Sequence, residues 1–188
     1  YIKRKDIMIL EAYHGTDAKN ADSILSENFI YKRNKKHWLG NGIYFYLDLS
    51  LAKWWTTNPT RKFGVKIKNG VIIDVTIDID DTYVFDLRKL SDFKTFVYLY
   101  YSEFLPYINS GIVEIPHQKY RQIRCSYCDF LQEQYQIKAI IGNFFYKKHR
   151  SYSPDKYDEF VKKIDLHYIE TQLCLFDKTC IIDKHLHI

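Results

Sequence analysis

The chain has few residues that break regular structure and no long apolar segment. Its 188 residues include only four prolines and seven glycines, which argues against long linkers or disordered tracts. No run of about eighteen apolar residues occurs, so we expect no membrane-spanning helix. No secretory signal is visible either, and we expect a cytoplasmic protein. The length suits one domain over residues 1–188 with a sizeable core.

The four cysteines do not form a convincing zinc site. Cys125 and Cys128 form a C-x-x-C pair, but Cys174 and Cys180 are further apart, and Cys174 lies in an apolar run that predicts a strand. A structural zinc site would need two close pairs on turns. We therefore expect no metal and interpret all four as reduced cysteines.

Aromatic residues are abundant and charge is only modestly unbalanced. Aromatics make up 17% of the chain, which predicts a ring-rich core, and the net charge is +5. That charge permits a nucleic-acid partner or an acidic protein without requiring either. Basic residues alternate with aromatic ones in segments 31–38 and 146–152. Such a mixture suits a phosphate backbone with stacked bases, which favours nucleic acid slightly over protein; a solvated basic surface is the alternative.

Apolar patterns predict strands and helices that do not strictly alternate, which favours an α+β fold. On the helix expected at 92–108, Phe93, Phe96, Val97 and Tyr100 should face the core. Asp17 and Ser153 are expected to cap the helices that follow them. The expected strands are 7–10, 43–45, 71–79, 136–141 and finally 168–176, and the expected helices are 17–28, 48–55, 92–108 and 153–166.

The strongest functional signal is a pair of motifs near the start of the chain. Tyr13-His14-Gly15-Thr16 is followed by a second motif, Gly-Ile-Tyr-Phe, at 42–45. A neutral histidine can hydrogen-bond a ribose hydroxyl. The backbone of Gly15 can approach a ligand closely because glycine has no Cβ. Tyr44 offers a flat ring for stacking. Together they suggest a nucleotide pocket, with residue types that suit NAD⁺.

A third element is expected in the strand at 168–176. Glu170 and Gln172 are two residues apart, so they should project side by side from one face. There they could hydrogen-bond a ribose and stabilise positive charge developing beside it. The alternative is the exposed polar face of an edge strand. Glu133 and Glu114 are the alternative acids if this register is wrong.

In the order of these motifs the chain resembles the ADP-ribosyltransferase superfamily. The resemblance is to the His-Tyr-acid branch of poly-ADP-ribose polymerases and diphtheria-like toxins, and to small bacterial toxin or phage-defence members whose last motif centres on a glutamine. It implies split mixed and antiparallel sheets flanked by helices around an NAD⁺ cleft. The residues that carry it are 13–16, Ile24, Leu25, Phe29, 39–45, Ala52 and 170–173.

The resemblance also implies roles for individual residues. His14 would hold the adenosine ribose, Gly15 and Thr16 the nicotinamide carboxamide, and Tyr44 would stack on the nicotinamide. Either Glu170 or Gln172 would bind the nicotinamide ribose. The basic segment 31–38 would cover the donor. The implied site residues are His14, Tyr44, Glu170 and Gln172 for catalysis and His14, Gly15, Thr16, Gly42 and Tyr44 for binding NAD⁺ as co-substrate.

The implied activity is mono-ADP-ribosyl transfer to a nucleic acid or protein, in a toxin or defence effector with a possible antitoxin or immunity partner. An NAD⁺ glycohydrolase on the same fold and a non-catalytic NAD⁺- or ADP-ribose-binding module are the alternatives. A neutral glutamine in the third motif, which cannot act as a base, favours the module. An RNA 2′-phosphotransferase would need clustered arginines, and Arg121, Arg124 and Arg150 are not obviously clustered in the sequence.

Overall fold

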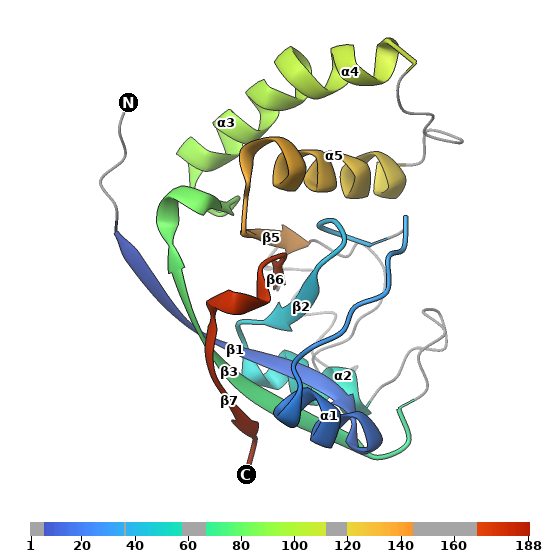
Figure 1. Cartoon of the computed structure of the whole chain (residues 1–188), viewed down its shortest axis with the longest axis vertical. Coiled ribbons are helices and arrows are strands. Elements are labelled where there is room, and N and C mark those ends of the chain that lie inside the picture. Colours follow the sequence, from blue (N-terminus) through green and yellow to red (C-terminus); the bar gives the residue numbers. More distant parts are fainter. Residues whose placement is uncertain (1–5, 36, 58–66, 112–119, 145–168) are drawn as a thin grey trace, which may run out of the picture.

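Seven strands form a single mixed sheet in this computed structural model, which describes residues 6–35, 37–57, 67–111, 120–144 and 169–188. The sheet order is β4-β5-β6-β2-β1-β3-β7, with helices on both sides (Figure 1). The fold is therefore α+β, as the sequence predicts. The strands are β1 (Ile7–Asp17), β2 (Ile43–Tyr46), β3 (Gly70–Asp80), β4 (Val84–Asp86), β5 (Ala139–Phe144), β6 (Glu170–Leu175) and β7 (Ile181–Leu186). The helices are α1 (Ala21–Ser26), α2 (Leu49–Thr57), α3 (Leu90–Leu99), α4 (Leu105–Asn109) and α5 (Tyr120–Tyr135).

The sheet has two halves that meet at a single residue pair. β1 pairs with β3 over its whole length, from Ile7–Asp80 to Asp17–Gly70, whereas β1 and β2 pair only at Tyr13–Tyr46. β4 and β5 are parallel and all other pairs are antiparallel. Sequence resemblance predicts separate sheets. The strands instead form one sheet, but its halves β4-β5-β6-β2 and β1-β3-β7 are joined through that one pair.

The largest core cluster lies between the two halves of the sheet. Phe45 and Leu173 from one half pack together with Ile73 and Val75 from the other, and α1 adds Ile24. Alternation along β3 explains this: its buried residues occupy every second position from Ile73 onward, as the sequence predicts. Each half therefore presents one apolar face to the other.

A second core cluster lies under α3, α4 and α5, which cover the other face of β5 and β6 (Figure 1). Phe96 and Tyr100 of the α3 region pack into it, but Phe93 and Val97 are exposed. The predicted core stripe is thus half wrong, because α3 presents a different face to α5. A π-helical turn at Tyr100–Phe104 joins α3 to α4 and precedes Pro106, which lacks an N–H for a regular helical bond.

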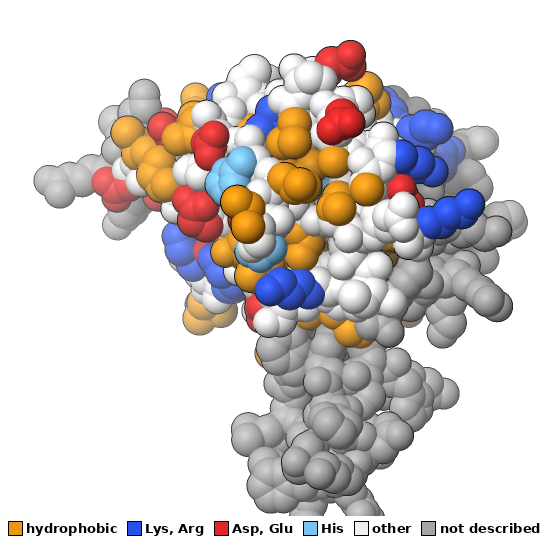
Figure 2. Space-filling view, turned by 90° about the horizontal axis from the view of Figure 1, so that it is seen from below, with side chains coloured by type: hydrophobic (Ala, Val, Ile, Leu, Met, Phe, Trp, Pro, Cys, Tyr) orange, Lys and Arg blue, Asp and Glu red, His pale blue; other side chains and the backbone are white. Residues whose placement is uncertain are grey.

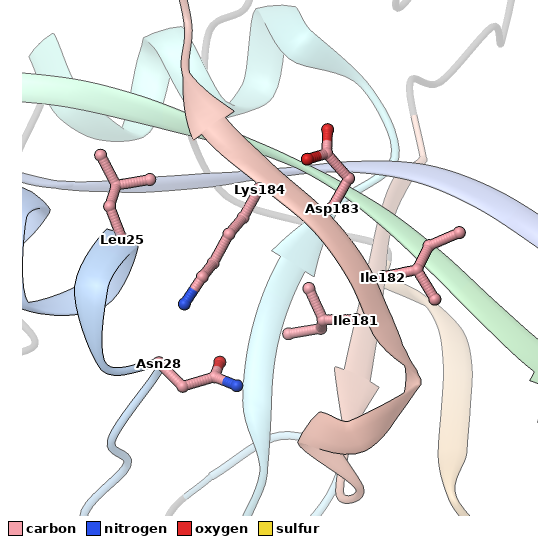
Figure 3. Close-up of a pocket in the computed structure, with 6 residues that line it drawn as sticks. All are labelled: Leu25, Asn28, Ile181, Ile182, Asp183 and Lys184. Carbon is pink, nitrogen blue, oxygen red and sulfur yellow. The ribbon is translucent and has the colours of Figure 1, made fainter.

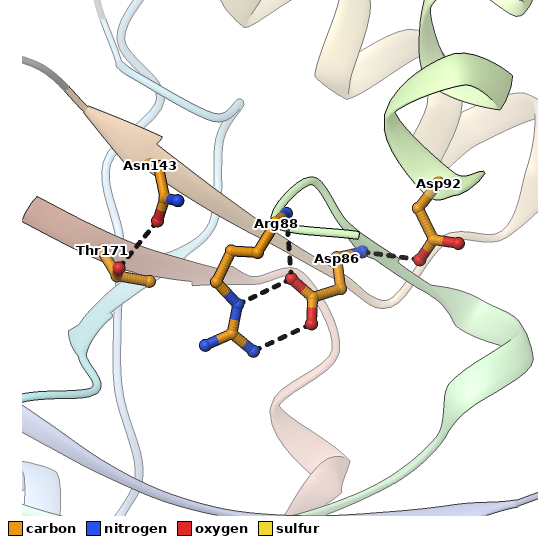
Figure 4. Close-up of polar contacts among 5 residues, drawn as sticks. All are labelled: Asp86, Arg88, Asp92, Asn143 and Thr171. Carbon is orange, nitrogen blue, oxygen red and sulfur yellow. Dashed lines mark hydrogen bonds and ion pairs between the residues drawn. The ribbon is translucent and has the colours of Figure 1, made fainter. Parts of the chain in front are cut away.

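Polar contacts fix the start of α3 against the sheet (Figure 4). Arg88 donates from Nε and Nη2 to both carboxylate oxygens of Asp86, each at 2.8 Å. Asp92 accepts from the backbone N–H of Asp86 at 3.1 Å. Across β5 and β6, Thr171 donates to the Asn143 side chain at 2.7 Å. α3 therefore begins at a defined place beside β4.

Several sequence predictions need correction. β6 is not the last strand, because β7 follows and forms a sheet edge. α5 was not predicted at all. β5 begins at Ala139, since Gln136 has a left-handed φ of 54°. The helix expected from Ser153 lies outside the described residues. Among the described helices, none is long and apolar enough to cross a membrane.

Candidate functional site

The two halves of the sheet diverge at His14. Continuing the Tyr13–Tyr46 pairing would place Gly15 opposite Tyr44, but the pairing stops there among the described residues. Instead, His14 Nδ1 bonds the Tyr44 carbonyl oxygen at 2.9 Å. A side chain thus takes the place of a backbone partner. β1 beyond Tyr13 is consequently paired only with β3, so its backbone diverges from that of β2 at this point.

The His14 ring is held in one orientation and one protonation state. It packs edge-on against Phe29 and Phe45, with ring centroids 5.0 and 5.8 Å away. Burial lowers the pKa of His14, and the bond to the Tyr44 carbonyl opposes that shift. The ring is therefore neutral at pH 7. Because a carbonyl can only accept, Nδ1 carries the proton and Nε2 keeps a lone pair that can accept a hydrogen bond.

Tyr44 is fixed by the turn that precedes it. Its hydroxyl donates to the Gly40 carbonyl at 2.8 Å and accepts from the Leu39 N–H at 2.6 Å. The ring packs against the edge of the His37 ring, 5.6 Å away. Burial raises the pKa of Tyr44, so the phenol stays neutral. The position of this ring therefore depends on the geometry of the turn at 39–42.

An aspartate on α5 holds that turn in place. Asp129 accepts from the backbone N–H of Asn41 and from its side-chain amide, both at 2.6 Å. Gly40 has φ +91°, and a Cβ there would lie 2.9 Å from the Asp129 carboxylate. Asn41 in turn accepts from the Asn34 N–H at 2.7 Å. Asp129 was not predicted as a site residue because α5 was not predicted; the apolar spacing of Ile123, Tyr127 and Leu131 was the signal available.

Glu170 and Gln172 lie side by side, as the alternation of β6 predicts. The Gln172 amide donates to the Glu170 carboxylate. Both side chains are buried, Glu170 completely. β6 lies between β5 and β2, so the interpretation of these residues as an exposed edge-strand face is wrong. The amide donor therefore holds the buried Glu170 carboxylate in one orientation beside Gln172.

Register shows how these residues lie relative to one another. Gln172 pairs with Tyr46, and Tyr44 pairs with Cys174. Gln172 is therefore the diagonal neighbour of Tyr44 on the same face, about 7–8 Å away for such pairs. Glu170 lies one further step along β6. The His14 ring contacts Phe45, which points to the opposite face of β2 from Tyr44. His14 and Tyr44 thus meet through the Tyr44 carbonyl and not through their side chains.

The remaining predicted binding residues have structural partners. A Cβ on Gly15 would lie 3.0 Å from the Ala52 carbonyl of α2, and one on Gly42 would lie 2.6 Å from the Leu175 carbonyl of β6. Close packing alone therefore excludes a Cβ at Gly42 and crowds one at Gly15. Thr16 is buried and accepts from the Asn20 amide at 3.3 Å. Their contact with a ligand stays a prediction.

The alternative acids and the arginines are placed as follows. Glu133 is exposed on the last turn of α5, and Glu114 lies outside the described residues. Arg121 and Arg124 both lie over the Trp38 ring, at 4.5 and 5.3 Å from its centroid. The expectation that these two arginines are not clustered is therefore wrong. Arg150 also lies outside the described residues.

All four cysteines are free and buried. Cys125 and Cys128 lie one turn apart on α5, and Cys174 lies on β6 as predicted. Within the described part of the chain, no group of three or more His, Cys, Asp or Glu side chains is arranged to hold a metal ion. Burial raises the pKa of Cys125 to about 12, so its thiol is protonated at pH 7.

A shallow cavity of about 280 Å³ lies away from these residues, between the end of α1 and β7 (Figure 3). Lys184 extends beside it and donates to the Ile24 carbonyl at 2.6 Å. None of the predicted site residues lines it. Its lining residues are Leu25, Asn28, Ile181, Ile182, Asp183 and Lys184.

Comparison with known proteins found one relative at the level of sequence. The chain is 34% identical over 89 residues to an uncharacterized protein of Methanocaldococcus jannaschii, and the match covers 47% of this chain and 42% of that protein. The chain therefore spans less than half the length of this relative. No protein-family model matches the chain, and no solved structure does. Similarity to this relative therefore assigns no substrate or partner to this chain.

Proposed function

We propose that this protein is an NAD⁺-dependent mono-ADP-ribosyltransferase whose donor binds where β1 and β2 diverge. The observation that carries the proposal is the His14–Tyr44 bond at that point. Burial keeps His14 neutral, and the bond fixes the tautomer in which Nε2 is the acceptor that a ribose hydroxyl needs. The buried pair Glu170–Gln172 lies on the strand that pairs with β2.

Each residue then has a chemical role in the proposal. His14 Nε2 accepts a hydrogen bond from a hydroxyl of the adenosine ribose, and the Tyr44 ring stacks on the nicotinamide. Glu170, which is held by the Gln172 amide, accepts a hydrogen bond from the 2′-hydroxyl of the nicotinamide ribose. Its negative charge also stabilises the positive charge that develops at the anomeric carbon. Electrostatic stabilisation of this kind is stronger at a buried carboxylate than at an exposed one.

The reaction needs no redox step. The bond between nicotinamide and the anomeric carbon breaks, and its electron pair leaves with nicotinamide, which becomes neutral. An oxygen or nitrogen of the acceptor forms the new bond to that carbon and releases its proton to water. If water is the acceptor, the same step makes the protein an NAD⁺ glycohydrolase. Because the donor and the carboxylate are held in a fixed orientation, less entropy is lost in reaching the transition state, and this favours both reactions.

Equilibrium binding of NAD⁺ tests the proposal together with nicotinamide release. His14→Ala removes the acceptor, and NAD⁺ should bind at least tenfold more weakly, a loss of about 1.4 kcal/mol. Asp183→Asn changes an exposed residue of β7 and serves as the control. Equal NAD⁺ affinity in wild type and His14→Ala, with both proteins folded, would contradict the proposal. NAD⁺ binding without nicotinamide release would favour the non-catalytic module.

A further inference from the structure

Two stretches that contact each other carry Lys and Arg side chains without any Asp or Glu. Residues 30–42 and residues 120–128 contain no acidic residue. Asp129, which directly follows the second stretch, already accepts two hydrogen bonds from Asn41. The basic residues of the two stretches are Lys32, Arg33, Lys35, Lys36, Arg121 and Arg124.

Three contacts hold the two stretches together. Arg124 Nε donates to the Trp38 carbonyl at 2.6 Å, and Cys125 donates to the Asn34 carbonyl at 3.4 Å. Arg121 lies over the Trp38 ring. Asn34, which stands between Arg33 and Lys35, is thus held against α5 about one turn from Arg121.

These side chains are open to solvent. Lys32, Arg33, Lys35 and Arg121 are exposed, and so are the rings of two flanking tyrosines: Tyr31 is 40% exposed and Tyr120 is 90% exposed. The face seen from below in Figure 2 differs, because there charged side chains of both signs surround exposed hydrophobic ones. We call the set Tyr31, Lys32, Arg33, Lys35, Trp38 and Arg121 the basic face.

We propose that the basic face binds a single-stranded polynucleotide, which the transferase uses as acceptor. Lysine and arginine neutralise backbone phosphates, and exposed aromatic rings stack on bases. An acidic peptide would use the cations but not the exposed rings. The segment that carries the basic face leads directly into the turn at 39–42, where Gly40 accepts from the Tyr44 hydroxyl. A polynucleotide bound there would lie beside the turn that positions Tyr44. The acceptor role rests on the proposed function, whereas the binding does not.

Fluorescence anisotropy with labelled 20-nucleotide DNA and RNA strands, in the absence of NAD⁺, tests the binding. The variant Lys32→Ala/Arg33→Ala/Lys35→Ala removes three cations. Each phosphate contact to a single strand contributes about 0.7 to the slope of log K against log salt, so the slope should decrease by about 2. If the two lines converge near 1 M salt, the variant binds about 100-fold more weakly at 0.1 M.

The matched control removes the same charge elsewhere. Lys53→Ala/Lys94→Ala/Lys178→Ala changes three exposed lysines on α2, α3 and the turn before β7. It lowers the net charge equally but leaves the basic face intact. We expect this control to keep most of the wild-type affinity and slope. Arg121→Glu should weaken binding as well, because it places a negative charge in the middle of the basic face.

The outcomes separate this inference from the proposed function. Equal losses in the two triple variants, or no binding at 50 mM salt, would overturn the basic face as a binding site. Binding that maps to the basic face without release of nicotinamide would uphold the site and refute the transferase. Label from NAD⁺ that protease but not nuclease releases, and that the Lys32→Ala/Arg33→Ala/Lys35→Ala variant still transfers, would refute the acceptor role while leaving the transferase intact.

Discussion

Removing the Asp129 carboxylate should destabilise the protein and disturb Tyr44 together. In Asp129→Ala, two donors of Asn41 lose an ionised acceptor at 2.6 Å. Hydrogen bonds to charged groups contribute about 1.5–3 kcal/mol each, and paired bonds are not additive, so we expect a loss of about 3 kcal/mol. For a chain of this length, that lowers Tm by about 6–12 °C. Asp129→Asn keeps one acceptor oxygen and should lose about half as much.

Thermal unfolding followed by circular dichroism measures the effect. Glu133→Ala is the matched control, because Glu133 lies on the same helix, carries the same charge and is exposed. It should change stability by less than about 0.5 kcal/mol. A difference of about 2 °C in Tm corresponds to at most about 1 kcal/mol, at about 2–4 °C per kcal/mol. If the Tm values of Asp129→Ala and Glu133→Ala differ by less than about 2 °C, the turn at 39–42 does not depend on α5. In that case the account of how Tyr44 is positioned is wrong.

Three further predictions concern the other site residues. Burial lowers the pKa of His14, so below about pH 6.5 the unfolded chain binds more protons than the folded chain, and the free energy of unfolding decreases as the pH is lowered. In urea unfolding at pH 7.5 and 5.5, His14→Gln should lose part of this pH dependence. Equal pH dependence in wild type and variant would refute the burial effect. Gln172→Glu places a second carboxylate beside Glu170, which raises the pKa of the pair above its unfolded value; we expect a loss of about 2 kcal/mol at pH 7.5 that diminishes toward pH 5, and a wild-type pH profile would contradict the contact. Tyr44→Phe removes the hydroxyl between Leu39 and Gly40 but keeps the ring, so stability should fall by about 1–3 kcal/mol while nicotinamide release persists; complete loss of release in a folded variant would assign the hydroxyl a direct role.

Most strands, and the pair Glu170–Gln172, could be predicted from local sequence patterns. The alternation of β3 and β6 fixes which side chains share a face, and that information is present in a single strand. Asp17 was predicted to cap a helix over 17–28, and this is only partly right. Asp17 ends β1 and accepts from the Lys19 N–H at 3.3 Å, which caps a 3₁₀ turn at Ala18–Asn20, whereas α1 begins at Ala21.

What the sequence could not predict depends on contacts between distant segments. Asp129 contacts Asn41 across 88 residues, and nothing in either stretch indicates the other. The direction of Phe93 depends on where α5 packs. The single-pair joint between β1 and β2 also has no local signal, because Tyr46 is an ordinary strand residue. These features arise from tertiary packing, which selects among local patterns that are individually acceptable.

Release of labelled nicotinamide from NAD⁺ tests the central claim most directly. Purified wild-type protein and Glu170→Gln, a replacement of nearly equal size, would be compared after confirming that both are folded. The account predicts release by wild type, with and without an added polynucleotide, and a reduction of at least 100-fold in the variant, about 2.7 kcal/mol of transition-state stabilisation. Release at equal rates would show that Glu170 is not the catalytic carboxylate. No release by wild type under either condition would contradict the proposed activity itself.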